Sequence, residues 1–535
     1  AKKAMEKARR TGIRIDNPYG YDRAFQYCPS DKEEFWLLEE TQKLGIDQPT
    51  ILDPTAGGGA IPFEALRLGC KTRANDINPV AVLVQKATYE WPAKFGRSVL
   101  NEYQRLVQVF RQRLEERLAV YFPQLKAPEE LDCTYLWART IHCPYCAGKV
   151  PLSPNWKLAP DGTGVRLIPQ CGTGPGDSSR HCTFEIVSFA QEQSEATVKG
   201  GDATCPYPCC NRVIDGDQVK AQAQAGGMGE QLFAVVYKRR LPTAYTKTGK
   251  PKADKWERGY RAPRPEDDNS EAIAAALAEK LPEWEALDLV PNEEVPFGFE
   301  TNIRWPLHLY GIKRWTQFFS PRQLLCHGTS AEIFRELVQE ETARSEGMAD
   351  QTQAAITYVS LALDKLRDYN SRMTRWHSIR EVMVNTFDRD DFAFKWSYAE
   401  MAPLIEGLGY DWAFGQVSKC IKELIDLLDH QSEEPVASGT LPLFNLSTQR
   451  TSKQRTDSVV ISGGSGASLA HLDAGSVDAV VMDPPCYDNV MYAEWPTRPA
   501  MRAKRAPRFS QGSTINAKWP RSSPNAAACS KTMAS

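Results

Sequence analysis

The stretch Thr50-Ile51-Leu52-Asp53-Pro54-Thr55-Ala56-Gly57-Gly58-Gly59 decides the fold that we expect. Its first three residues are typical of a short buried strand, and the glycine turn leads into a helical pattern from Ile61 to Leu68. A second strand, Lys71 to Asp76, and a second helix at about Val80–Tyr89 follow. Strand, glycine turn, helix, strand and helix in this order indicate the opening of a doubly wound α/β sheet.

The glycine turn and the acidic residue after it form a candidate nucleoside site. Glycines at a strand end let the backbone approach a ligand closely. Asp76 lies seventeen residues after Gly59 at the end of the second strand, where a carboxylate can accept both ribose hydroxyls. The pattern is not G-x-G-x-x-G and no P-loop lysine follows, which disfavours a nicotinamide dinucleotide and a triphosphate. Three glycines alone would more simply be a structural turn, but Asp53 and Asp76 beside them favour the nucleoside site.

A second motif, Asp483-Pro484-Pro485, follows the apolar run Val477 to Met482, which we expect to be a buried strand. Such a loop suits methylation of an exocyclic amine, because a carboxylate (Asp483) and a carbonyl (Pro484) can each accept one N–H. The prolines fix φ, so both acceptors are held before a base arrives. An aromatic side chain such as Tyr487 can stack on an extruded base. We expect direct in-line transfer, with positioning as the main catalytic contribution. Alone, the motif would more simply be a turn after a strand.

The segments ILDPTAGGGAIPFEALRLG (51–69), NDINPVA (75–81) and VVMDPPCYDNVMYAE (480–494) together resemble the zinc-ribbon-containing adenine-specific DNA methylases. The resemblance covers about residues 17–494. It implies a Rossmann-like S-adenosylmethionine-dependent methyltransferase sheet with an inserted zinc ribbon and a mostly helical insertion. The implied reaction is methylation of N6 of an adenine flipped out of double-stranded DNA. Partners from a restriction or phage-defence system are also implied.

The motifs and the resemblance give the following expected site residues. We expect the cofactor S-adenosyl-L-methionine to be held by Asp53, Pro54, Ala56, Gly57, Gly58, Gly59, Asp76 and Asn78. We expect the target amine and base to be held by Asp483, Pro484, Pro485 and Tyr487. The family motif places Tyr or Phe directly after the second proline, whereas Cys486 intervenes here, which puts the stacking role of Tyr487 in doubt.

Other interpretations of the second motif stay open. Pro485-Cys486 is similar to the nucleophile of cytosine-C5 methyltransferases, but the Glu-Asn-Val tripeptide that supplies their acid does not occur in the chain. Cytosine N4 or an RNA base is an alternative amino target. A zinc-bearing nucleic-acid-binding protein that has lost catalysis is a further alternative. Family members carry segments at both ends that we expect to be missing or altered here, so this fragment is expected to be inactive if they are required.

Fourteen cysteines in a chain without a signal peptide indicate metal binding in a reducing cytoplasm rather than disulfides. Two Cys-Pro turns, Cys143 to Cys146 and Cys205 to Cys210, can supply the four thiolates of a closed structural zinc site. We expect Cys143, Cys146, Cys205 and Cys209 as ligands, with Cys210 competing for the fourth place. Cys171, His181 and Cys182 lie between the turns and are candidate substitutes or ligands of a second metal.

The chain of 535 residues is long enough for several domains. We expect the cofactor-binding half of a methyltransferase domain at 17–125, a zinc ribbon at 133–240, a helical region at 271–430 that is a candidate for target recognition, and the catalytic-loop half of the methyltransferase domain at 455–495. The segments 246–269 and 431–457 are predicted linkers, and 496–535 is predicted to be a non-native or disordered tail.

The charge pattern gives one expectation about partners. The net charge of −2 does not indicate a nucleic-acid binder, but a local basic face would be enough. No apolar run approaches the length of a membrane span, so we expect no membrane partner. Basic and aromatic residues that could contact DNA or pack a helical core are Arg304-Trp305, Lys313-Arg314-Trp315, Arg322-Gln323, Arg367, Arg372, Arg375-Trp376 and Lys395-Trp396.

Overall fold

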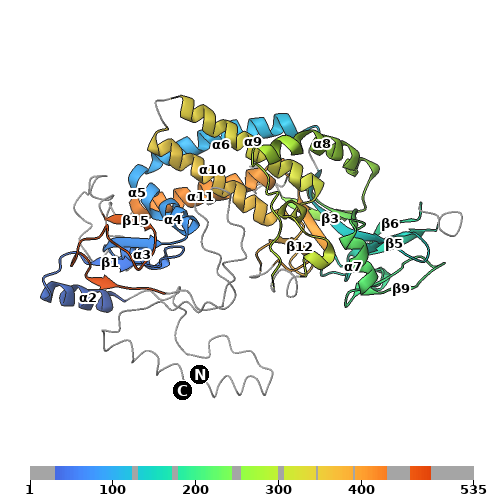
Figure 1. Ribbon diagram of the computed structural model, residues 1–535, viewed down its shortest axis with the longest axis horizontal. Coiled ribbons are helices and arrows are strands. Elements are labelled where there is room, and N and C mark those ends of the chain that lie inside the picture. Colours follow the sequence, from blue (N-terminus) through green and yellow to red (C-terminus); the bar gives the residue numbers. More distant parts are fainter. Residues whose placement is uncertain are drawn as a thin grey trace, which may run out of the picture. The chain divides into compact units, whose positions relative to one another are not determined.

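A computed structural model describes residues 30–122, 130–171, 179–243, 255–298, 306–344, 348–388, 392–429 and 458–483. These residues form a mixed α/β structure that contains a parallel sheet, an antiparallel sheet and a group of long helices (Figure 1). The predicted linker 431–457, the motif residues from Pro484 onward and the predicted tail 496–535 lie outside the described residues. No described helix is both long enough and apolar enough to span a membrane.

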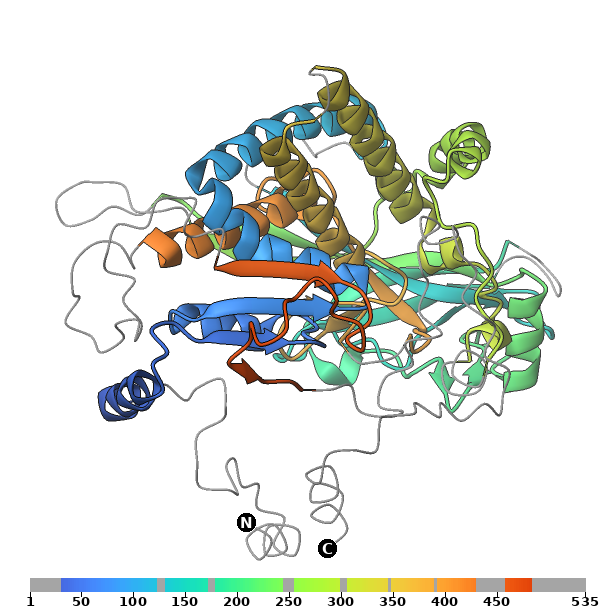
Figure 2. The ribbon, with the colours of Figure 1, turned by 60° about the vertical axis from the view of Figure 1, so that its left-hand side comes forward.

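The parallel sheet, sheet A, joins the two ends of the sequence. Its strands are β1 (Thr50–Asp53), β2 (Lys71–Asp76), β15 (Val459–Gly463) and β16 (Ala479–Val480), in the order β15-β2-β1-β16. All three pairings are parallel. Figure 2 shows the red strand β15 beside the blue strands, although they are far apart in the sequence. The carboxyl ends of all four strands therefore meet at one edge of the sheet.

The helices of this segment follow the sequence pattern closely. A first helix, α2 (Asp31–Lys43), precedes β1, and the expected helix after the glycine turn is α3 (Ala60–Arg67). The expected helix after β2 divides into α4 (Pro79–Gln85) and a π-helical turn, η2 (Lys86–Glu90). The short α5 (Trp91–Phe95) then leads to α6.

The expected buried strand from Val477 to Met482 is wrong in length and burial. β16 has only two residues, and both are exposed. It lies at the edge of the described part of sheet A, where it pairs with β1 alone among the described strands. Its apolar composition is that of an interior strand, which is why the sequence pattern suggested burial.

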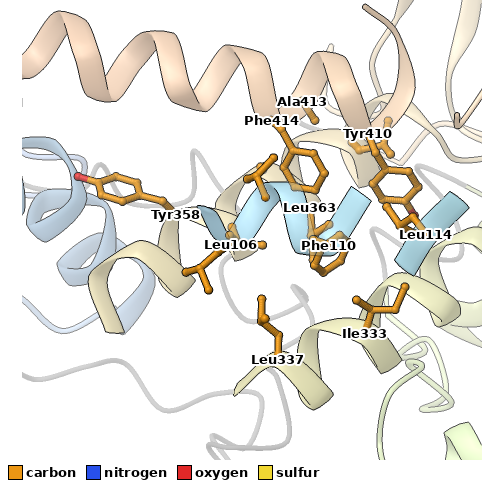
Figure 3. Close-up of a cluster of buried hydrophobic side chains, with 14 of the residues drawn as sticks. Leu106, Phe110, Leu114, Ile333, Leu337, Tyr358, Leu363, Tyr410, Ala413 and Phe414 are labelled. Carbon is orange, nitrogen blue, oxygen red and sulfur yellow. The ribbon is translucent and has the colours of Figure 1, made fainter. Parts of the chain in front are cut away.

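Long helices pack around one apolar core. They are α6 (Arg97–Leu118), α8 (Ser270–Ala286), α9 (Pro321–Ala343), α10 (Asp350–Tyr369) and α11 (Gly409–Asp429). Figure 3 shows Leu106, Phe110 and Leu114 of α6 pointing toward side chains of α9, α10 and α11. In α6 the buried residues recur every three or four positions, as the period of an amphipathic helix requires. The helix therefore shares its core with the region 271–430 rather than only with the cofactor-binding half.

The antiparallel sheet, sheet B, lies in the cysteine-containing region. It has the order β11-β10-β3-β14, and β4 also pairs with β3. Its strands are β3 (Glu130–His142), β4 (Lys149–Leu152), β10 (Gly229–Arg240), β11 (Trp256–Arg261) and β14 (Ser397–Met401). The expected linker 246–269 is wrong where β11 forms, because an exposed edge strand needs no alternating apolar pattern. β14 brings a segment of the helical region into the same sheet.

Short elements complete the described structure. They are β5 (Gly164–Gln170), β6 (His181–Val187), η3 (Ala190–Glu192), β7 (Val198–Lys199), β8 (Asp202–Thr204), β9 (Val213–Ile214), α7 (Gly216–Gln224), η4 (Pro265–Asp267), η6 (His308–Tyr310), η7 (Trp315–Phe318), β12 (Arg375–His377) and β13 (Val382–Val384).

Candidate functional site

The glycine turn after β1 is held in place by the carboxylate that ends β2. The N–H of Gly57 donates to Asp76 Oδ2 at 2.7 Å, and the N–H of Asn78 donates to Asp76 Oδ1 at 2.7 Å. Each carboxylate oxygen has a further lone pair, so Asp76 can still accept hydrogen bonds from a ligand. The two expected nucleoside-binding elements therefore lie in direct contact.

Two side chains from α4 and η2 fix the glycine turn from behind. Gly59 has a φ of 85°, and a Cβ there would lie 2.9 Å from both Gln85 and Tyr89. Gln85 donates to the carbonyl of Gly57 at 2.8 Å, and the Tyr89 hydroxyl donates to Gln85 Oε1 at 3.0 Å. Burial raises the pKa of Tyr89, so its hydroxyl stays a donor. The π-helical turn η2 contains Tyr89, and such turns are frequent at functional sites.

The loop after β15 joins the same edge. The Asn75 side chain donates to the carbonyls of Pro54 (3.1 Å) and Gly464 (2.9 Å), which ties two loops together. A Cβ at Gly466 would lie 2.9 Å from the Pro54 carbonyl, so this glycine permits the close approach. Sequence reasoning missed Asn75, Gln85, Tyr89 and Gly466, and the local pattern gives no signal for contacts over these sequence distances.

Asp483 lies at this edge as well, because β16 pairs with β1. The register places Leu52 opposite Val480, and the N–H of Val481 donates to the Leu52 carbonyl at 3.0 Å. The pKa of the Asp53 carboxyl is raised, first by burial and then by the negative charges of Asp76 and Asp483. Three carboxylates from strands at the two ends of the sequence thus gather near one another.

The residues expected to bind the cofactor differ in burial and in their contacts. Ala56 and Pro54 are buried and Gly58 is exposed. Asn78 caps α4, since its side chain accepts from the N–H of Val80 at 3.0 Å. Two large apolar side chains beside Asp76 are exposed, Ile77 at 77% and Val80 at 61%. The expected target-binding residues Pro484, Pro485 and Tyr487 lie outside the described residues, as does Cys486.

Four cysteines form a cluster that can hold a metal ion. The sulfur atoms of Cys143, Cys146, Cys205 and Cys210 all lie within 4.8 Å of one another. Two sulfur pairs, Cys143–Cys210 and Cys146–Cys205, are 3.7 Å apart. A tetrahedral zinc with Zn–S bonds of about 2.3 Å separates its sulfurs by about 3.8 Å. The cluster therefore has nearly the dimensions of a four-thiolate metal site.

The fourth member is Cys210 and not Cys209, which corrects the expected ligand set. The Cys209 side chain is exposed, and its sulfur lies 3.9 Å from that of Cys171. In each turn the cluster cysteine directly precedes a residue with positive φ, Ala147 at 62° or Asn211 at 47°. Asparagine tolerates this conformation, so Asn211 was the signal in the sequence that could have selected Cys210.

The hydrogen bonds of the two turns explain the different cysteine spacing. In the first turn, the N–H of Cys143 donates to the Gly148 carbonyl at 2.9 Å. In the second, the N–H of Cys205 donates to the Arg212 carbonyl at 3.0 Å, which makes that turn two residues longer. The second turn can therefore accommodate Cys-x4-Cys. Among the described residues no second cluster of this kind includes Cys171, His181 or Cys182.

Most of the expected DNA-contacting residues are used within the chain. Trp315 is buried, Gln323 is buried, and Trp376 donates to the Leu158 carbonyl at 2.7 Å. Arg304 and Trp305 lie outside the described residues, whereas Lys313 and Arg314 are exposed. Intramolecular ion pairs occupy the arginines: Arg322 with Glu400, Arg367 with Asp364, Arg372 with Glu230, and Arg375 with Asp388.

Comparison with known proteins found no matching family model, no matching curated protein and no matching solved structure.

Proposed function

We propose that this chain is an S-adenosylmethionine-dependent methyltransferase that acts on the exocyclic N6 amine of adenine in DNA. One observation carries the proposal: the glycine turn with Asp76 and the end of β16, three residues before Asp483, lie at the same edge of sheet A. The two motifs are more than 400 residues apart in the sequence. If either had belonged to another sheet, the proposed chemistry would have failed.

The topology supports a ligand site at this edge. If the four strands are numbered in chain order, sheet A has the order 3-2-1-4, as at the start of a doubly wound sheet. The order reverses beside β1, and ligands of such sheets bind outside the carboxyl ends at the reversal. The two strands that flank this point are β1, which ends at Asp53, and β16, which is followed by Asp483.

The proposed cofactor fits the donors and acceptors of the site. Asp76 retains lone pairs for ribose hydroxyls, and the exposed Ile77 and Val80 offer apolar surface to a flat base. The glycines of the turn, Gly57 to Gly59, allow the backbone to lie close to the ligand. S-adenosylmethionine, when bound, supplies an electrophilic methyl group on sulfur.

The residues of the chain supply orientation and hydrogen-bond acceptance. The exposed Asp483 carboxylate accepts one N–H of the target amine, so the nitrogen lone pair is directed at the methyl group. With the cofactor bound, the methyl group would pass from sulfur to the amine nitrogen and the neutral thioether would leave, while the nitrogen would lose one proton to the Asp483 carboxylate and from there to solvent. Asp53 lies near Asp483 and adds negative charge that favours this release.

We also propose that the four-cysteine cluster is a structural zinc ribbon. Cys143 and Cys205 are buried at 1% and 0% exposure, and four thiolates leave no coordination position for a substrate. The zinc would therefore hold the two turns together and take no part in methyl transfer.

The decisive test measures methyl transfer from labelled S-adenosylmethionine to mixed-sequence duplex DNA, with nucleoside mass spectrometry of the product. We expect N6-methyladenine from the wild type and none from Asp483→Ala, while cofactor binding persists in the variant. Asp473→Ala is the matched control, because it removes another exposed carboxylate of the same segment. N4-methylcytosine, or a product only on RNA, would redirect the substrate assignment. No transfer and no thermal shift with the methyl donor would remove the proposal.

A further inference from the structure

Arg139 occupies an unusual position in the middle of sheet B. It belongs to β3, which is labelled in Figure 1 and pairs with β10 on one side and β14 on the other. Its side chain is buried, and the residue is only 5% exposed. A buried guanidinium is costly unless a counter-charge and hydrogen-bond acceptors surround it.

One edge of this guanidinium has no hydrogen-bond partner among the described residues. Its Nε and Nη2 atoms are both buried and unpartnered. These two nitrogens point their hydrogens in the same direction, which is the fork that binds two oxygens of one oxyanion. The rings of Phe394 and Tyr398 lie 5.5 and 5.7 Å from the guanidinium carbon, in the range of cation–π contacts.

The local charge is not balanced. Glu230 lies directly across the strand pair from Arg139. Its Oε2 atom, however, accepts from Arg372 at 3.0 Å and from the Tyr398 hydroxyl at 2.8 Å. Two guanidinium groups therefore share one carboxylate, which leaves a surplus positive charge. Burial, together with the charge of Arg372, lowers the pKa of Arg139 to about 10.

A second buried arginine, Arg322 of α9, lies against this sheet and shows how such a group is normally satisfied. Arg322 also lies over aromatic rings, including Tyr135 at 5.0 Å. It donates through Nε to Glu400 at 2.8 Å and through Nη1 to Asn269. Arg139 has the same kind of aromatic surroundings but no equivalent acceptors on its fork.

We propose that Arg139 is a binding site for a small phosphate-type oxyanion, held by the Nε–Nη2 fork. Such an anion supplies both missing acceptors and the missing negative charge, whereas water would supply only the acceptors. Trp137 lies two residues earlier on the same strand face, and its indole Nε1 is also buried without a partner among the described residues. Burial of the fork favours a free phosphate or a small phosphorylated molecule over the backbone of a duplex.

The test measures the thermal midpoint of the full chain in inorganic phosphate and in sodium chloride of equal ionic strength. Overnight equilibration allows for slow exchange into a buried site. We expect phosphate to raise the wild-type midpoint by about 3 °C more than chloride does. Arg139→Met, which keeps the length of the stem, should lose this difference, and Arg139→Lys should lose most of it. Arg166→Met removes an exposed arginine and should keep the full effect.

The variants also give a measurement that does not depend on ligand addition. Without phosphate, Arg139→Met should have a midpoint no lower than that of the wild type, because an apolar side chain replaces an unpaired buried charge. A strongly destabilised or unfolded Arg139→Met in chloride alone would mean that the guanidinium is already satisfied, and would overturn the proposal. Equal phosphate effects in wild type and Arg139→Met would also overturn it. If duplex DNA raised the wild-type midpoint and inorganic phosphate did not, the proposal of a site for a small phosphate would be overturned in favour of a contact with the DNA backbone. None of these outcomes depends on methyl transfer.

Discussion

The four-cysteine cluster and the loop edge of sheet A are both built at the ends of strands, but they are assembled in different ways. The cluster comes from two local turns, whose backbone hydrogen bonds fix the cysteines. The sheet edge brings together loops from both ends of the sequence, and its order depends on strand register. Damage to one turn should therefore abolish the metal site, whereas damage to the sheet edge should act in graded steps.

The largest effect is expected at the cluster. Cys210→Ser should reduce bound zinc from about one per chain to nearly none, because a hydroxyl is a poor zinc ligand. The region should lose cooperative folding with the metal, since structural zinc contributes about 10–16 kcal/mol of binding free energy. Metal analysis and protease resistance measure the two effects. Cys209→Ser is the matched control and should keep its zinc. Loss of zinc in Cys209→Ser with retention in Cys210→Ser would reverse the ligand assignment.

A smaller loss is expected at the sheet edge for Asp76→Ala. Removal of an acceptor for charged hydrogen bonds should weaken S-adenosylmethionine binding about tenfold to a hundredfold. Calorimetric titration measures the change, and the zinc content should stay at the wild-type value. Asp76→Asn is the control, because its amide oxygen can still accept from the N–H of Gly57 or Asn78. Unchanged cofactor affinity in Asp76→Ala would place the cofactor elsewhere.

The difference between the two regions also explains what could be predicted from the sequence. β1, β2 and the cysteine turns are local features, so apolar runs, glycines and spacing were enough to predict them. Cys210 takes the fourth place because Asn211 after it adopts a positive φ, and the spacing of the cysteines does not reveal that conformation. β14 pairs with β3 across some 260 residues of sequence, and no local pattern specifies that partner. The Nε and Nη2 atoms of Arg139 are left without a hydrogen-bond partner among the described residues by this packing, so the sequence could not predict them.

Register at the sheet edge gives the next prediction. Asp478 fixes the start of β16, since its carboxylate accepts from the N–H of Thr50 at 2.7 Å and its own N–H donates to the Thr50 carbonyl at 3.0 Å. Asp478→Ala should lower the free energy of unfolding by about 1 kcal/mol. Methyl transfer should fall more than cofactor affinity, because Asp483 loses its position while Asp76 does not. Asp478→Asn, which keeps an acceptor, should recover most of the transfer. Equal losses of transfer and of cofactor binding would show that β16 does not position Asp483 separately.

The smallest effect is expected for Asp53→Asn and depends on pH. The pKa of Asp53 is raised above its ordinary value of 3.8 in the folded chain, first by burial and then by Asp76 and Asp483. Above this folded pKa, the ionised Asp53 carboxyl therefore lowers the free energy of unfolding. This loss of stability disappears as the pH falls through the folded pKa toward 3.8. Asp53→Asn should be slightly more stable at pH 7, because the neutral amide avoids the cost of a buried charge. Its amide oxygen can still accept from the N–H of Thr55, which donates to Asp53 Oδ1 at 3.1 Å. Urea midpoints of the cofactor-free protein between pH 7 and pH 4 measure the difference, which should narrow as the pH falls. A difference that stays constant over this range would mean that the folded chain does not raise the pKa of Asp53, and the crowded acidic edge would no longer distinguish this region from the cysteine cluster.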